Sequence, residues 1–179
     1  MIAVLLSVQQ KYILDVLRKL GAIRRGQLAA LVRGKFERPG QEISEVRWES
    51  ILRQLRVRTS DVFLESEMVR LSGVRPDALC LEAVDVMLEL AEGKPEDFTT
   101  RVERPGILRF SWGADLRLFT VAELSAPIHP TVETLAHLKR VIWITESGVP
   151  PESLTLPPKH FFAARQSDGS HRFYGSNGP

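Results

Sequence analysis

The sequence has few of the residues that build cross-links, metal centres or cofactor sites. Its 179 residues include one cysteine, Cys80, so the chain can form no disulfide within itself, which fits a reducing cytoplasm. The four histidines show no zinc-ligand spacing, and no glycine-rich phosphate loop is present. We therefore expect no metal, no cofactor and no catalytic residues.

Long apolar runs and an excess of one charge are also missing. Segment 2–8 is apolar but short, and it has neither a basic start nor a small-residue cleavage site. It predicts no signal peptide and no membrane span, and we expect an extra strand or a flap there. With 44% hydrophobic residues, 26% charged residues and a net charge of +2, the composition predicts a soluble, cytoplasmic globular protein.

Residues 1–73 predict three helices followed by a short hairpin. Ser7 and Gln10 form a capping box at the start of the first helix, and Gly21 is a typical helix stop. This order is typical of a winged helix, a fold used mostly to bind duplex DNA. The expected elements are helices over 8–20, over 26–33 and from the cap Ser44 to about Leu55, and a hairpin over 62–71.

Positive charge is concentrated in the first 58 residues. They hold twelve Lys or Arg and five Asp or Glu, a net charge of +7, so the rest of the chain carries −5. This split predicts one half that binds an anion and another half with a different role. The alternative is that the positive charge only keeps the protein soluble.

The predicted third helix supplies candidate contacts to DNA bases, because in a helix-turn-helix arrangement it would be the recognition helix in the major groove. In the alternative, Arg47 and Arg53 belong to an ordinary solvated face and pair with Glu45 and Glu49. The candidates lie opposite the apolar stripe of Trp48, Ile51, Leu52 and Leu55, and they are Arg47, Ser50, Arg53 and Gln54.

Two arginine pairs are candidate contacts to the DNA backbone. Arg24 and Arg25 lie at the start of the second helix, where free N–H groups attract phosphate. Arg56 and Arg58 follow the third helix. The hairpin turn 65–67 is acidic instead and would repel phosphate, so we expect the hairpin to serve packing or dimerisation.

Residues 74–179 predict a mixed α/β domain, and the fold class of the whole chain is therefore α+β. The run 118–122 is nearly continuously apolar, as expected of a central strand covered on both faces, and 141–145 is expected to be another buried strand. The other expected elements are a connecting helix over 78–91, strands over 106–112 and 116–124, a helix over 130–138, a Pro-rich connector over 150–158 and a C-terminal hairpin of 160–165 with 171–174.

Four stretches carry a resemblance to a known family: Tyr12–Gly21, Gln27–Leu31, Leu52–Leu55 and Asp168–Gly175. With the order of elements, they make the chain resemble the replication-relaxation proteins of plasmids and conjugative elements. It resembles still more closely a related uncharacterised family from mobile elements of Gram-positive gut bacteria. The resemblance implies DNA binding in the replication, transfer or regulation of such an element. It also implies a second half similar in outline to restriction-type nuclease folds.

A nuclease site of that type needs an acid and then Asp or Glu, one residue and Lys, which together hold a divalent metal and activate water. Asp115 and Glu123 could supply the acids, but Ser125 stands where the lysine is required. We therefore expect a degenerate nuclease-like scaffold without enzymatic activity.

Two functions from different classes remain open. In the first, the winged helix binds double-stranded DNA and the α/β half mediates homodimerisation or binds a protein partner. In the second, the protein is a non-enzymatic adaptor whose winged helix contacts protein. The acidic residues of the third helix and the hairpin favour the second function.

Overall fold

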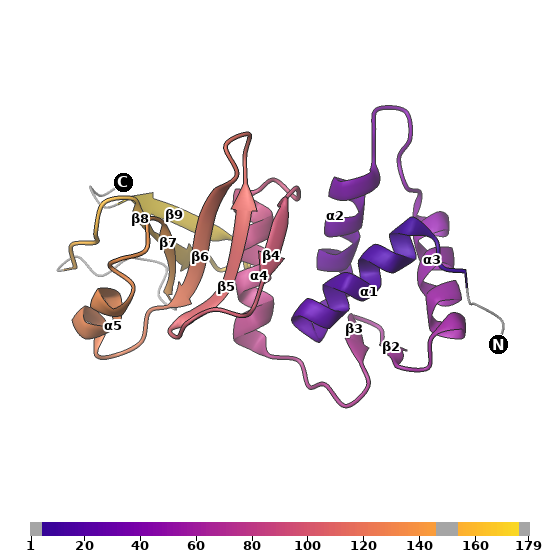
Figure 1. Ribbon diagram of the computed structural model, residues 1–179, viewed down its shortest axis with the longest axis horizontal. Coiled ribbons are helices and arrows are strands. Elements are labelled where there is room, and N and C mark those ends of the chain that lie inside the picture. Colours follow the sequence, from indigo (N-terminus) through magenta and orange to yellow (C-terminus); the bar gives the residue numbers. More distant parts are fainter. Residues whose placement is uncertain (1–4, 146–153, 176–179) are drawn as a thin grey trace. The chain divides into compact units, whose positions relative to one another are not determined.

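The computed structural model describes residues 5–145 and 154–175, and its fold class is α+β (Figure 1). The chain divides into two compact units, Met1–Leu81 and Glu82–Pro179. The boundary falls inside helix α4 (Ala78–Leu90). The expected extra strand or flap over 2–8 lies partly outside the described residues, and Leu5–Ser7 have no regular secondary structure before the first helix begins.

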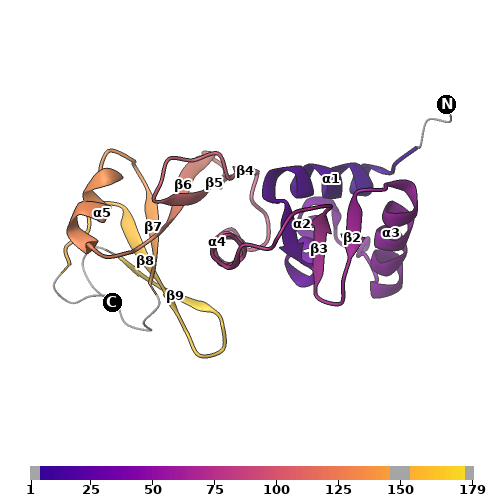
Figure 2. The same ribbon diagram turned by 90° about the horizontal axis from the view of Figure 1, so that it is seen from below.

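The first unit contains three helices and a three-stranded antiparallel sheet with the order β1-β3-β2. Figure 2 shows the β2–β3 hairpin beside α3. In chain order the elements are α1 (Val8–Leu20), β1 (Ala22–Arg24), α2 (Arg25–Phe36), α3 (Glu45–Arg58), β2 (Val62–Leu64) and β3 (Met68–Leu71).

The predicted starts of the first and third helices are confirmed. Ser7 and Gln10 form the capping box of α1, in which the Ser7 hydroxyl accepts from the Gln10 N–H at 3.2 Å. The Ser44 hydroxyl accepts from the Arg47 N–H and caps α3. The predicted apolar stripe of α3 is buried in the core of this unit, and it consists of Trp48, Ile51, Leu52 and Leu55.

Three local expectations in this unit were wrong. Strand β1 was not predicted, because its three residues gain their hydrogen bonds from β3, which is far away in the sequence. Helix α2 extends to Phe36 rather than to residue 33. Helix α3 includes Arg56 and Arg58 in its last turn, where positive charge complements the helix dipole, so these arginines do not follow the helix.

Gly21 fixes the turn between α1 and β1. Its φ of +77° is a conformation that L side chains rarely adopt, and a Cβ added there would lie 2.8 Å from Val74 Cγ1. The glycine is therefore required by both the backbone conformation and the space around it.

The second unit is built on a six-stranded sheet with the order β4-β5-β6-β7-β8-β9. Pairs β6–β7 and β7–β8 are parallel and the other pairs are antiparallel. Its strands and short helix are β4 (Asp97–Thr99), β5 (Gly106–Trp112), β6 (Arg117–Glu123), α5 (Ile128–Thr134), β7 (Val141–Thr145), β8 (His160–Arg165) and β9 (His171–Gly175).

The strands over 106–112 and 141–145 and the C-terminal hairpin are confirmed. Strand β4 was missed because it has only three residues. The predicted helix over 130–138 was wrong at both ends: α5 starts at Ile128, because a proline is tolerated in the first turn, and 135–138 form turns. The expected connector over 150–158 lies partly outside the described residues.

The two faces of this sheet carry different kinds of side chain, apolar on one and charged on the other. One face packs against α5 through an apolar cluster that includes Trp143 and Phe162. Strand alternation places Arg165 and His171, which pair across β8 and β9, on the opposite face. There both side chains contact Glu82, from the part of α4 that belongs to this unit.

Candidate nucleic-acid interface

The predicted base-contacting residues share the outward face of α3. Arg47, Arg53 and Gln54 are exposed and Ser50 is half-buried. The Gln54 amide donates to the Ser50 hydroxyl at 3.3 Å across one turn. Among the described residues, no hydrogen bond or ion pair reaches the guanidinium of Arg47 or Arg53. The face therefore presents two guanidinium groups and a polar pair to its surroundings.

The acidic residues of α3 are engaged with α2. Glu45 accepts from the Arg33 guanidinium at 2.7 Å, and Glu49 accepts from Arg25 at 2.7 Å. The alternative that they pair with Arg47 and Arg53 was wrong. Arg25 and Arg33 of α2 reach these two glutamates across the space between the helices. The carboxylates are thus drawn toward α2, away from the outward face.

Arg24 and Arg25 lie where the sequence placed them but differ in their surroundings. Arg24 is the exposed N-cap residue of α2, and its backbone N–H donates to Gln27 Oε1 at 3.1 Å. Arg25 is only 24% exposed in its side chain, because its guanidinium also reaches the carbonyl of Glu65 in the hairpin at 3.4 Å. Arg25 therefore links α2, α3 and the hairpin turn.

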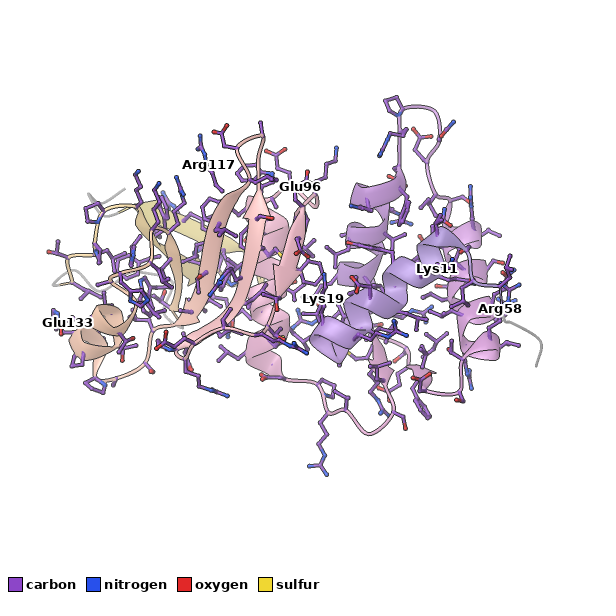
Figure 3. The ribbon with its side chains drawn as sticks, in the orientation of Figure 1. Lys11, Lys19, Arg58, Glu96, Arg117 and Glu133 are labelled. Atoms are coloured by element: carbon purple, nitrogen blue, oxygen red, sulfur yellow. The ribbon has the colours of Figure 1, made fainter. Side chains whose placement is uncertain are left out.

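Arg56 and Arg58 also differ. Arg56 is exposed, and within the described chain no partner contacts its side chain. Arg58, at the C-terminal end of α3 (Figure 3), donates to the carbonyl of Leu5 at 2.8 Å and to Gln10 Oε1 at 3.3 Å. Its guanidinium thus holds the segment before α1 against α3.

The acidic hairpin turn is partly neutralised. Arg70 Nε donates to Glu65 Oε1 at 2.8 Å, and the same guanidinium lies 5.2 Å from the centre of the Phe63 ring. Glu67 stays exposed at the turn. Of the two glutamates that would repel phosphate, one is therefore paired within the hairpin.

Sequence reasoning missed Val46 as a surface feature of α3. Its side chain is 83% exposed, next to Arg47 in the first turn, and Val57 at the other end of the same face is 82% exposed. The signal was available, because both residues lie opposite the stripe that contains Trp48 and Leu55 when the helix period is followed.

The two acids considered for a nuclease site do not meet. Asp115 precedes β6 and pairs with Arg117 at 3.0 Å, at the start of that strand (Figure 3), whereas Glu123 ends the strand. A strand rises about 3.3 Å per residue, so β6 alone separates them by roughly 20 Å. The two candidate acids therefore do not lie together in one site. In the ranges 5–145 and 154–175, no group of three or more His, Cys, Asp or Glu is arranged to hold a metal ion.

A buried ionic cluster in the second unit was also missed by sequence reasoning. His171 Nε2 lies 3.1 Å from Glu82 Oε1 and its Nδ1 lies 3.0 Å from Glu89 Oε1, and Arg165 donates to Glu82. Burial raises the pKa of Glu82, but the hydrogen bonds from Arg165 and His171 outweigh it, so this pKa lies below its ordinary value of 4.5. The His171 and Glu82 side chains are 1% and 8% exposed, whereas Arg165 and Glu89 are 47% and 31% exposed, so the cluster joins a buried pair to the surface and stabilises the fold.

His160 is buried in the core of the second unit and is fully hydrogen-bonded as a neutral ring. Its Nδ1 accepts from Trp143 Nε1 at 3.3 Å, and its Nε2 lies 2.9 Å from the carbonyl of Leu138, to which it donates. Burial lowers the pKa of His160 below 6.5 and outweighs the opposite effect of the Leu138 carbonyl. The residue is a structural part of the core.

Comparisons with known proteins give no relative from which a function can be transferred. No protein-family model, no curated protein and no solved structure matches the chain significantly. None of the helices in the described ranges has the length and hydrophobicity that crossing a membrane requires. The candidate interface is therefore argued from its own residues.

Proposed function

We propose that the first unit is a winged helix that binds double-stranded DNA through the outward face of α3. The proposal is supported by the order helix, strand, helix, helix and hairpin, in which α3 takes the place of a recognition helix. The single observation that carries it is the distribution of ion pairs. Glu45 and Glu49 are occupied by arginines of α2, while Arg47 and Arg53 are exposed and have no ion-pair partner among the described residues.

This distribution matters because a recognition surface needs cations that are not already neutralised. Phosphate contacts from arginine release counterions and supply most of the nonspecific affinity for DNA. Exposed guanidinium groups can also bind the edge of guanine in the major groove. The paired glutamates would not oppose either contact. In this proposal the chain acts in the replication, transfer or regulation of a mobile element.

The second unit is proposed to mediate homodimerisation or to bind a protein partner, on a nuclease-like scaffold without nuclease chemistry. The separation of Asp115 from Glu123 supports the absence of a two-acid site. A protein that binds DNA as a dimer would place two copies of α3 about one helical turn of DNA apart, roughly 34 Å.

The alternative is a non-enzymatic adaptor whose first unit contacts protein. It is favoured by the exposed apolar side chains of the same unit, among them Val46, Val57 and Phe63, together with the exposed Glu67. Exposed apolar patches often mark protein contacts. The two functions differ in their dependence on salt.

The test is a gel shift of the full chain with random-sequence duplex DNA over a series of salt concentrations. We expect the affinity to fall steeply with salt, since each phosphate contact contributes about 0.9 to the slope of log K against log salt. The variant Arg47→Ala with Arg53→Ala should bind more weakly. The control is Lys94→Ala with Arg101→Ala, which removes the same charge from exposed positions of the second unit.

If the wild type does not bind duplex DNA at low salt, the DNA-binding proposal fails and the adaptor function replaces it. If both double variants weaken binding equally, net charge and not the α3 face accounts for the affinity.

A further inference from the structure

The valine in the first turn of α3 has no role in the fold. Val46 is the second residue after the cap Ser44, and 83% of its side chain is exposed. A β-branched residue is also a poorer helix former than alanine at an exposed position. Neither burial nor helix propensity therefore accounts for this side chain.

The surroundings of Val46 are suited to a nucleic-acid groove. On one side lies the exposed Arg47, and on the same face Ser50 lies one turn and Gln54 two turns along the helix. On the other side the carboxylate of Glu45 is held by Arg33 at 2.7 Å. The first turn thus offers two methyl groups beside a free guanidinium, with its one acidic group already paired.

The major groove of DNA contains one apolar group, the 5-methyl of thymine, and small apolar side chains of recognition helices contact it. The first residues of such a helix are those that reach the base edges. Resting on the function proposed above, we propose that Val46 packs against the 5-methyl group of a thymine in the target duplex. Val46 is then a specificity-determining residue, which selects thymine at one position of the site.

Val57 provides a matched control on the same helix. It is 82% exposed on the same face, but it lies eleven residues further along. At 1.5 Å per residue this is about 16 Å along the helix axis. Val57 therefore has the same chemistry and exposure as Val46 but lies far from the first turn, and we expect it to contact no base.

The experiment first selects preferred sites from a random duplex pool with the wild-type full chain. Each thymine of a selected site is then replaced in turn by deoxyuridine, which keeps the base pair and removes only the methyl group. We expect one such replacement to weaken wild-type binding about fourfold, the effect of losing one buried methyl group.

The same replacement should weaken the binding of Val46→Ala less than that of the wild type, because alanine lacks the two γ-methyl groups that make most of the proposed contact. Val57→Ala should respond as the wild type does. Both variants place alanine at an exposed helix position, so both should fold.

The outcomes separate this inference from the function on which it rests. If the wild type binds no duplex DNA at low salt, the proposed function is overturned together with the inference. If it binds DNA but no deoxyuridine replacement weakens binding, the inference alone is overturned. It is also overturned if Val46→Ala distinguishes thymine from deoxyuridine as strongly as the wild type does, because another residue then reads the methyl group.

Discussion

One nitrogen of the Arg25 guanidinium lies 2.7 Å from both carboxylate oxygens of Glu49. This contact joins the first turn of α2 to the middle of α3. The ion pair also neutralises one positive and one negative side chain of the first unit. Arg25 therefore stabilises the position of the helix that we propose to read DNA.

The Arg25–Glu49 pair should contribute measurably to stability. In a double-mutant cycle of Arg25→Ala and Glu49→Ala, we expect a coupling free energy of about 0.5–1 kcal/mol, near the upper end for partly exposed pairs. The measurement is chemical denaturation of the four proteins. The pair Arg33–Glu45, in which Glu45 is 71% exposed, is the control and should show a smaller coupling. Equal couplings would contradict the role assigned to Arg25.

Arg24 and Arg47 should affect DNA binding in different ways. Arg24→Ala removes a proposed phosphate contact, so it should weaken binding to all sequences and lower the salt slope by about one unit. Arg47→Ala removes a proposed base contact and should cost roughly 1–3 kcal/mol at preferred sites only. Salt titrations with a selected site and with random DNA measure both effects. The prediction fails if the two variants behave alike on both kinds of DNA.

His160 should make the second unit less stable in acid. Its pKa in the folded protein is lowered, so the unfolded chain binds the proton first as the pH falls. The stability due to the neutral ring is complete above about pH 6.5 and is lost as the pH falls toward the folded pKa. The loss is at most about 1.4 kcal/mol per pH unit for one proton.

NMR of the imidazole nitrogens measures this directly, since at pH 6.5 the ring should be less protonated than an ordinary histidine, with the neutral form carrying its proton on Nε2. Denaturation of the wild type and of His160→Gln between pH 7.5 and 5.5 provides the energetic comparison, in which only the wild type should carry the His160 contribution. Half-protonation of the ring at or above pH 6.5 would refute the prediction.

Glu82 should stabilise the second unit at neutral pH. Glu82→Gln removes the charge that accepts from Arg165 and His171, and we expect a loss of about 1–3 kcal/mol, because one accepting oxygen is replaced by an NH2 donor and the other loses its charge. The pKa of Glu82 is lowered in the fold, so its contribution is present above about pH 4.5 and is lost as the pH falls further. Denaturation at pH 7 and pH 4 should show a smaller difference between the two proteins at pH 4. A difference that does not shrink would show that Glu82 acts through packing alone.

The sequence by itself determined the elements whose signals are local. The cap Ser44 and the spacing of Trp48, Ile51, Leu52 and Leu55 define α3, because a helix satisfies its hydrogen bonds within one segment. The two apolar triplets around a polar turn define the β2–β3 hairpin, because its two paired strands are neighbours in the sequence. The outward positions of Arg47, Arg53 and Gln54 follow from the helix period.

Only the tertiary structure decided which charges remain available and which strands pair. β1 exists because Ile23 pairs with Val69, and Arg25 is occupied because Glu49 faces it, although each pair is separated by more than twenty residues. Sheet pairing and ion pairs depend on proximity in space, and proximity between distant segments is fixed by packing of the whole core and not by any local pattern.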